Sequence, residues 1–155
     1  MSVRNVVQIA IDEFGQAAKC TKKSGSWYLR NPELIFVLNL QKSQYGLTYF
    51  LNVAVWLTIL GDVEAPKENK CHIRTRVEDL LPLHLGSRIS GLLDMQTEID
   101  DLTRHVDLLA LLNQFLLPIV QRCSSVNDLR SGIGLQFVNQ SLVNGPALKI
   151  LEQSA

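Results

Sequence analysis

The sequence carries no net charge, because its 155 residues include 15 Lys and Arg against 15 Asp and Glu. Proteins that bind the nucleic-acid backbone usually show a basic excess, since neutralising phosphates supplies much of their affinity. The pair Lys22-Lys23 beside Trp27-Tyr28 is a pattern that can stack on nucleic acid. It also fits a turn followed by a strand whose aromatic rings anchor the core. We adopt the second interpretation and expect no nucleic-acid partner.

Long apolar runs are also missing. The longest apolar stretch, residues 47–60, is broken by Thr48, Asn52 and Thr58 and is too short to cross a bilayer. The N-terminal residues MSVRNVVQIAIDEFG lack the basic region and apolar run of a signal peptide. The chain has only 3 cysteines, an odd number without the spacing of a disulfide scaffold. We therefore expect a cytoplasmic protein with reduced thiols and no membrane association.

No repeat, linker or low-complexity tract interrupts the chain. Its 46% hydrophobic and 19% charged residues are typical of a folded globular protein. The length allows one domain with a single core. We expect one domain over residues 1–155, with a sheet region at about 26–78 and a C-terminal helical region at about 98–153.

An amphipathic helix is expected near the N-terminus. Apolar residues recur there at spacings of three and four, and Ser2 is placed to cap the first turn by accepting a backbone N–H. The apolar stripe consists of Val3, Val6, Val7, Ala10, Phe14, Ala17 and Ala18.

Four β-strands are expected next, at residues 27–30, 33–41, 47–57 and 71–77. Side chains in these segments alternate between two faces, which is the period of a strand. Asn31-Pro32 and residues 43–46 indicate turns, and residues 61–70 indicate a polar loop. Strands joined by short turns pair antiparallel.

The chain after Pro82 is expected to be mainly helical. Residues 83–96 fit either an edge strand near 89–95 or the start of a helix. From Glu98 an apolar stripe predicts a long helix that Pro118 should kink or end. The stripe consists of Ile99, Leu102, Val106, Leu109, Leu112, Leu116 and Val120. Short helices should follow, one ending near residue 129 and one over residues 146–151.

These elements predict an α+β fold, in which an antiparallel sheet of about four strands carries the N-terminal helix and the C-terminal helical segment on one face. The other face should stay at least partly open. Large apolar residues of the sheet need a helical cover to leave water, so we expect four of them to pack under the long helix: Phe36, Leu38, Phe50 and Trp56.

Polar side chains occupy strand positions where a buried strand would carry Val or Leu. They are Asn39, Gln41, Asn52, His72, Arg74 and Arg76. If the strands pair so that these faces coincide, the six side chains form one patch. Guanidinium groups suit carboxylates or phosphates, and amides orient neutral polar groups. The structural alternative is that Asn39 and Asn52 satisfy backbone groups while the arginines pair with Glu78 and Asp79 in solvent.

Cys71-His72 invites a metal site, but adjacent strand residues point to opposite faces and no second Cys or His stands at ligand spacing. We predict no metal and no cofactor. His72 is a conceivable general base, because its ordinary pKa lies near neutrality. Arg74 and Arg76 would, however, disfavour its protonated form.

Four motifs carry a family resemblance: KKSGSWYLRN, VLNLQKS, FLNVAVW and CHIRTRVEDLLP. Together they resemble a bacterial domain-of-unknown-function family, number 4304. The resemblance covers residues 14–82 and reaches the helical region through a helix ending at Leu117-Pro118. After Pro82 this chain has His84, Leu85 and Gly86 where the family pattern leads us to expect tryptophans. The family has no assigned activity, so the resemblance supports the fold and implies no reaction.

The sequence favours a non-enzymatic binding or interaction module that presents the polar stripe to a protein or a small anionic ligand. One version, based on analogy with small bacterial orphan domains, is an immunity-type protein that neutralises a toxin. The alternative is an enzyme or binding protein for a phosphate-containing ligand that uses His72, Arg74 and Arg76. The leucine stripe of residues 102–117 is assigned to the core, and a homodimer through it is the second interpretation.

Overall fold

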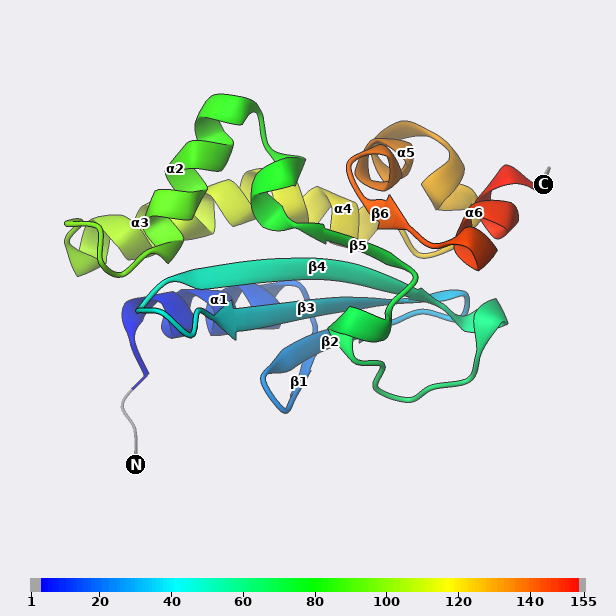
Figure 1. The fold of residues 1–155 in the computed structure, drawn as a ribbon, viewed down its shortest axis with the longest axis horizontal. Coiled ribbons are helices and arrows are strands. Elements are labelled where there is room, and N and C mark those ends of the chain that lie inside the picture. Colours follow the sequence, from blue (N-terminus) through cyan, green and yellow to red (C-terminus); the bar gives the residue numbers. More distant parts are fainter. Residues whose placement is uncertain (1–3, 154–155) are drawn as a thin grey trace.

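The computed structural model describes residues 4–153 and shows an α+β fold built on an antiparallel sheet (Figure 1). The sheet has six strands in the order β1-β2-β3-β4-β5-β6, and every neighbouring pair is antiparallel. The strands are β1 (Thr21–Lys23), β2 (Ser26–Arg30), β3 (Leu34–Lys42), β4 (Tyr49–Leu57), β5 (Ile73–Arg76) and β6 (Leu142–Val143). The predicted fold class is confirmed, whereas the expected number of about four strands is too low.

The two missed strands lie at the edges of the sheet. β1 pairs with β2 through a tight turn in which Ser24 and Gly25 both have positive φ, at 51° and 79°. Such a two-residue turn matches the twist of the flanking strands. β6 contributes only a two-residue pairing to β5. Both strands are too short to show an alternating pattern.

Residues 4–153 form six α-helices: α1 (Val6–Ala17), α2 (Leu83–Leu93), α3 (Asp101–Leu111), α4 (Leu117–Arg122), α5 (Gly132–Asn139) and α6 (Gly145–Glu152). α1 packs beside α3 and, together with α3 and α4, covers one face of the sheet. Within residues 4–153, no helix is both long enough and apolar enough to traverse a bilayer.

The N-terminal helix begins at a capping box. The Asn5 side chain accepts from the Gln8 backbone N–H, and the Gln8 side chain accepts in return from the Asn5 N–H. The predicted cap Ser2 and the first stripe residue Val3 lie outside the described residues. The helix lies close against β2 at Gly15, where a Cβ atom would come within 2.5 Å of the Trp27 ring.

The segment at residues 83–96, which the sequence left open between an edge strand and a helix, begins with a helix. α2 spans Leu83–Leu93 and buries Ile89, Leu92 and Leu93. The edge strand that was the alternative does not form, and this segment makes only an isolated β-bridge between Thr48 and Asp94.

The long C-terminal helix is interrupted before Pro118. Residues Leu112–Leu116 form a π-helical turn between α3 and α4, closed by a hydrogen bond from the Leu117 N–H to the Leu112 carbonyl. Proline lacks an N–H and clashes with the preceding turn, which explains why the regular α-helical hydrogen bonding is lost there. The helix does not end at Pro118, because α4 continues to Arg122. The predicted apolar stripe is partly wrong, because Leu102 and Val106 are 73% and 54% exposed.

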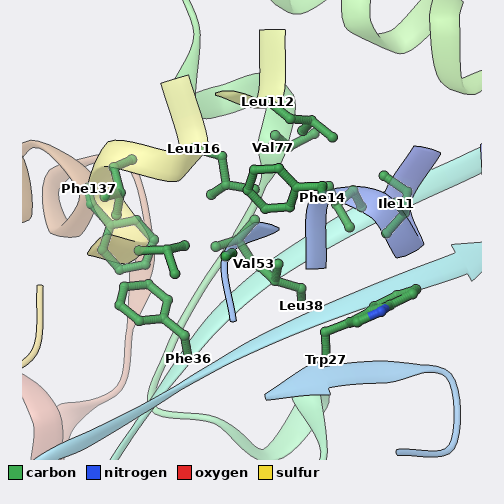
Figure 2. Packing of buried hydrophobic residues seen from close by; sticks show 14 of the residues in the cluster. Ile11, Phe14, Trp27, Phe36, Leu38, Val53, Val77, Leu112, Leu116 and Phe137 are labelled. Atoms are coloured by element: carbon green, nitrogen blue, oxygen red, sulfur yellow. The ribbon is translucent and has the colours of Figure 1, made fainter. Parts of the chain in front are cut away.

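The main core lies between the sheet and the helices (Figure 2). Phe14 and Ile11 from α1 lie above Trp27 and Leu38, and Phe36 lies beside Phe137 from α5, with ring centroids 5.9 Å apart. Phe36 and Leu38 thus lie in the main core as predicted, although the aromatic partner of Phe36 belongs to α5 and not to the long helix. Phe50 and Trp56 do not, because their neighbours in β4 point toward the helices and alternation places both rings on the other face.

The other face is half covered by the connection between β4 and β5. This connection packs on Ile35, Val37 and Ala54 through Cys71, with Tyr28 and Trp56 at its margin. It is tied to the sheet by the Trp56 indole N–H, which donates to the Gly61 carbonyl at 2.9 Å. The predicted polar loop is therefore a cover over one half of this face, and the remaining half is open.

Candidate binding groove on the open sheet face

The sheet face opposite the main core carries the predicted polar side chains in cross-strand rows. The register places Ser26, Asn39, Asn52 and Arg76 in one row across four strands. The next row contains Val37, Ala54 and Arg74. Gln41 and His72 share the same face by alternation. The structure thus brings all six candidate residues onto one sheet face, which we call the open face.

Three amide side chains form a hydrogen-bonded network at the centre of the open face. Asn52, only 6% exposed, donates from Nδ2 to Asn39 Oδ1 at 3.3 Å and to Gln41 Oε1 at 3.0 Å. Asn39 donates in turn to Ser26 Oγ at 3.0 Å. A satisfied network of this kind holds its members in one arrangement. The network thus presents fixed polar groups at the surface instead of mobile side chains.

The two arginines flank this network. Arg74 donates from Nε to Glu68 Oε1 at 3.1 Å, and its side chain remains 40% exposed. Arg76 lies over the Phe50 ring, with its Cζ 4.1 Å from the ring centroid. Within residues 4–153 neither arginine pairs with Glu78 or Asp79, which was the structural alternative. Phe50 does not lie in the main core, where the sequence predicted it, but orients Arg76 on the opposite sheet face.

These side chains form the floor of an elongated depression, which we call the polar groove. It consists of two adjoining pockets of about 560 Å³ and 680 Å³ that share Gln41, Glu68 and Arg74. Its lining residues are Lys23, Ser24, Ser26, Tyr28, Asn39, Gln41, Asn52, Ala65, Lys67, Glu68, Asn69, Arg74, Thr75, Arg76, Asp79 and residues 139–142. The groove therefore runs from the β1-β2 turn to β6.

Sequence reasoning missed several of these lining residues. Lys67 and Glu68 belong to the connection that folds over the sheet, and Ser26 is identified only once the pairing of β2 with β3 is known. Residues 139–142 reach the groove because β6 pairs with β5, a contact between segments far apart in the sequence.

His72 lies apart from the other five residues, under Trp56. Its Nδ1 accepts a hydrogen bond from the Leu57 backbone N–H at 2.9 Å, and its ring centroid lies 4.2 Å from that of Trp56. The residue is 7% exposed and lines neither pocket of the groove. Burial lowers the pKa of His72, so the neutral ring that accepts this bond is favoured.

This arrangement predicts a stability loss in mild acid that depends on His72. The unfolded side chain has a pKa near 6.5 and the folded one a lower pKa, so below 6.5 the unfolded state binds more protons. The contribution of His72 to the free energy of unfolding is therefore retained above pH 6.5. It is lost as the pH falls below 6.5 toward the lower pKa of His72 in the folded state. The variant His72→Asn keeps an acceptor near the Leu57 N–H and does not titrate, so its unfolding free energy should fall less over this interval.

Urea unfolding at about pH 7.5 and about pH 5.5 measures this difference. His84→Asn, at an exposed position of α2, is the matched control and should behave like the wild type. An identical loss between the two pH values in the wild type and in His72→Asn would contradict the assignment.

The three cysteines are unbridged. Burial raises the pKa of Cys20 and Cys123 to about 11 and that of Cys71 to about 12, so all three remain thiols at neutral pH. Over residues 4–153, no cluster of three or more His, Cys, Asp or Glu side chains is arranged to hold a metal ion.

The family resemblance was tested by comparison with family models. A model described as a domain of unknown function, DUF4304, matches residues 20–122, more than half of the chain. The chain belongs to this family. No curated protein and no solved structure matches it. The DUF4304 match extends beyond the motif block into α3 and α4, so the resemblance is confirmed.

The DUF4304 segment supplies most of the groove. Lys23, the amide network and both arginines lie inside the matched residues, whereas the wall at residues 139–142 comes from outside them. The family description names no ligand, partner or reaction.

Proposed function

We propose that this DUF4304 protein is a non-enzymatic binding module whose polar groove captures an acidic segment of a protein partner. The observation that carries the proposal is the convergence of Asn39, Gln41, Asn52, Arg74 and Arg76 in one groove on the open face. Fixed amides and guanidinium groups recognise carboxylates and peptide groups by directed hydrogen bonds.

The charge of the groove favours an acidic occupant. Its lining carries Lys23, Lys67, Arg74 and Arg76 against Glu68 and Asp79. Glu68 already pairs with Arg74, and Arg76 makes no ion pair within residues 4–153. A partner carboxylate near Arg76 would gain bonds without displacing an existing pair. This complementarity also speeds encounter and selects against basic partners.

The shape of the groove favours a polypeptide over a small molecule. Small-molecule sites are mostly apolar with a few polar groups, whereas this groove is floored by amides and cations. It also extends from the β1-β2 turn past β5 to β6. An extended segment can use this length, while a small anion would occupy only one end.

The enzyme alternative has less support. Its candidate base was His72, but that side chain is buried, accepts a bond from the Leu57 N–H and lines neither pocket of the groove. A general base must reach the substrate proton directly or through one water. A small phosphate-containing ligand at Arg74 and Arg76 is retained as an outcome of the experiment below.

The proposal also covers the biological role, the cellular location and the oligomeric state. An immunity role against a toxin partner rests on analogy with small bacterial orphan domains. A cytoplasmic location is supported by the three unbridged cysteines. A homodimer through the stripe of residues 102–117, in which Leu102 and Val106 are exposed, stays a prediction, and sedimentation of the purified protein tests it.

The double variant Arg74→Ala/Arg76→Ala should abolish partner capture without unfolding the protein. Desolvated, hydrogen-bonded arginine contacts at an interface are worth about 2–5 kcal/mol, whereas the partly buried pair Arg74–Glu68, in which Arg74 remains 40% exposed, stabilises the fold by about 1 kcal/mol. The experiment compares thermal melts and the proteins retained from a lysate of the source cell, followed by titration of each retained protein.

The matched control is Arg88→Ala/Arg122→Ala, which removes the same charge from α2 and α4, outside the groove. It should retain the same partner as the wild type. If the groove variant and the wild type retain the same proteins at equal stability, the proposal is wrong. If no protein is retained and a small phosphate compound shifts the melt of the wild type but not that of Arg74→Ala/Arg76→Ala, the ligand of the groove is an anion and the polypeptide proposal fails.

A further inference from the structure

A second pocket lies on the helix-covered side of the sheet, between the first turn of α1, the β1-β2 turn and the ends of β3 and β4. It has a volume of about 250 Å³ and shares no lining residue with the polar groove. Its lining residues are Arg4, Gln8, Lys22, Gly25, Trp27, Leu40, Lys42 and Tyr49. The pocket therefore stands independently of the proposed function.

The sheet register explains how this pocket gathers cations. Lys22 lies opposite Trp27, and Lys42 lies opposite Tyr49. Trp27 faces the main core, so alternation places Lys22 on the covered side and Lys23 on the open face. The Lys-Lys and Trp-Tyr motif is thus split between the two faces, and only Lys22 and Trp27 contribute here.

Charge in this pocket is unbalanced. Arg4, Lys22 and Lys42 line it, and no carboxylate does. One carboxylate stands behind it, since Asp12 accepts from Lys22 Nζ at 2.9 Å and from Arg4 Nη1. Burial of Asp12 favours its neutral form, but the bonds from Lys22 and Arg4 prevail and lower its pKa. Three positive charges against one negative charge leave a surplus of two.

Neutral groups complete the pocket. Tyr49 is 6% exposed, and its hydroxyl accepts from Asn5 Nδ2 at 2.8 Å, which leaves the hydroxyl proton to donate. The first turn of α1 adds the positive end of a 12-residue helix. Trp27 and Leu40 form an apolar wall, and Lys22 Nζ lies 5.1 Å from the Trp27 ring centroid.

We propose that this pocket binds a phosphate monoester, with the phosphate among Arg4, Lys22 and Lys42 and the adjoining carbon atoms against Trp27 and Leu40. A phosphate monoester carries a charge of about −1.5 to −2 at neutral pH, which matches the surplus of two cations. A carboxylate would neutralise only half of it. The hydroxyl of Tyr49 supplies a donor to a third phosphate oxygen.

The full chain is titrated with inorganic phosphate and with phenyl phosphate. Binding is monitored through the indole N–H signals of the tryptophans in NMR spectra. The chain has 2 tryptophans, and Trp56 lies on the opposite sheet face, so its signal is an internal control. The Trp27 signal should shift saturably with both probes, more tightly with phenyl phosphate, while the Trp56 signal stays in place. The variant Trp56→Phe assigns the two signals.

Two lysine variants test the charge argument. Lys42→Gln should weaken phosphate binding at least about tenfold, because it removes one charged hydrogen-bond donor to the phosphate. Lys149→Gln, at an exposed position of α6 that lines neither this pocket nor the polar groove, should leave binding unchanged. Equal weakening by both variants, an equal shift with sodium chloride at matched ionic strength, or acetate binding as tightly as phosphate would each overturn the proposal.

Discussion

Replacing Arg104 with alanine is expected to lower the free energy of unfolding by about 3–5 kcal/mol, among the largest effects of any single substitution in this chain. Arg104 is only 1% exposed, although it lies on a helix whose neighbouring positions Leu102 and Val106 face solvent. Its guanidinium group is enclosed by the end of α2 and the loop that follows it.

The expected cost follows from the acceptors of Arg104. It donates to the main-chain carbonyls of Gly91 at 3.2 Å, Asp94 at 3.0 Å and Thr97 at 2.7 Å, and also to that of Leu92. The last carbonyls of a helix have no partner within the helix, and a cation there also interacts favourably with the helix dipole. Alanine would leave several of these carbonyls buried and unpaired.

Urea unfolding of Arg104→Ala measures the loss. Arg88→Ala is the control, since Arg88 forms an exposed pair with Asp107 at 2.6 Å that should be worth only about 0–1 kcal/mol. Arg104→Lys should fall between the two, because one ammonium group reaches fewer carbonyls than a guanidinium fork. Equal unfolding free energies for the two alanine variants would refute this role of Arg104.

Replacing Phe36 with alanine is expected to cost about 3–5 kcal/mol as well, through the cavity left in the core. Phe36 has no exposed surface, lies opposite Leu29 and Val55 in the sheet, and contacts the Phe137 ring across the layer. Its ring therefore joins the sheet to α5, and its loss removes contacts on both sides.

Phe50→Ala is the matched control on the other face, where the ring is partly exposed beneath Arg76. It should cost much less, since it leaves no enclosed cavity and loses a cation–π contact worth about 0.5–1 kcal/mol. Comparable melting temperatures for the two variants would show that the core is not where the structure places it.

The central strands were predictable because their side chains alternate over nine residues in β3 and in β4. β1, with three exposed residues, and β6, with two residues, carry no such signal. The folding of the β4-β5 connection over the sheet could not be predicted either. The connection is held there by hydrogen bonds from the side chains of Trp56 and Arg30 to main-chain carbonyls of the loop. Contacts to main-chain carbonyls leave no pattern in a sequence.

The predicted apolar stripe was wrong at Leu102 and Val106 of α3 for a physical reason. Its buried positions are Arg104, Leu108 and Leu111, so a charged residue stands where the pattern requires an apolar one. The spacing of Leu102, Val106 and Leu109 gave an equally regular stripe, and hydrophobicity alone selected it. The carbonyls that make Arg104 a core residue come from α2 and its loop, which a helical pattern cannot reveal.

The candidate site was predictable in its residues but not in its shape. Alternation alone assigns Asn39 and Gln41 to one face of β3, and Arg74 and Arg76 to one face of β5. Whether those faces coincide depends on register, since a shift of one residue would reverse them. The separation of His72 from the groove depends on its bond to the Leu57 N–H, which no sequence pattern shows.

The most direct test of the central claim is an NMR spectrum of the isotope-labelled protein with its captured partner. The claim that the polar groove is the binding surface predicts shifts of the side-chain amide signals of Asn39, Gln41 and Asn52 and of the Arg76 guanidinium signal, with little change at the exposed face of α3. Shifts confined to the helices, with the four groove side chains unchanged, would contradict it.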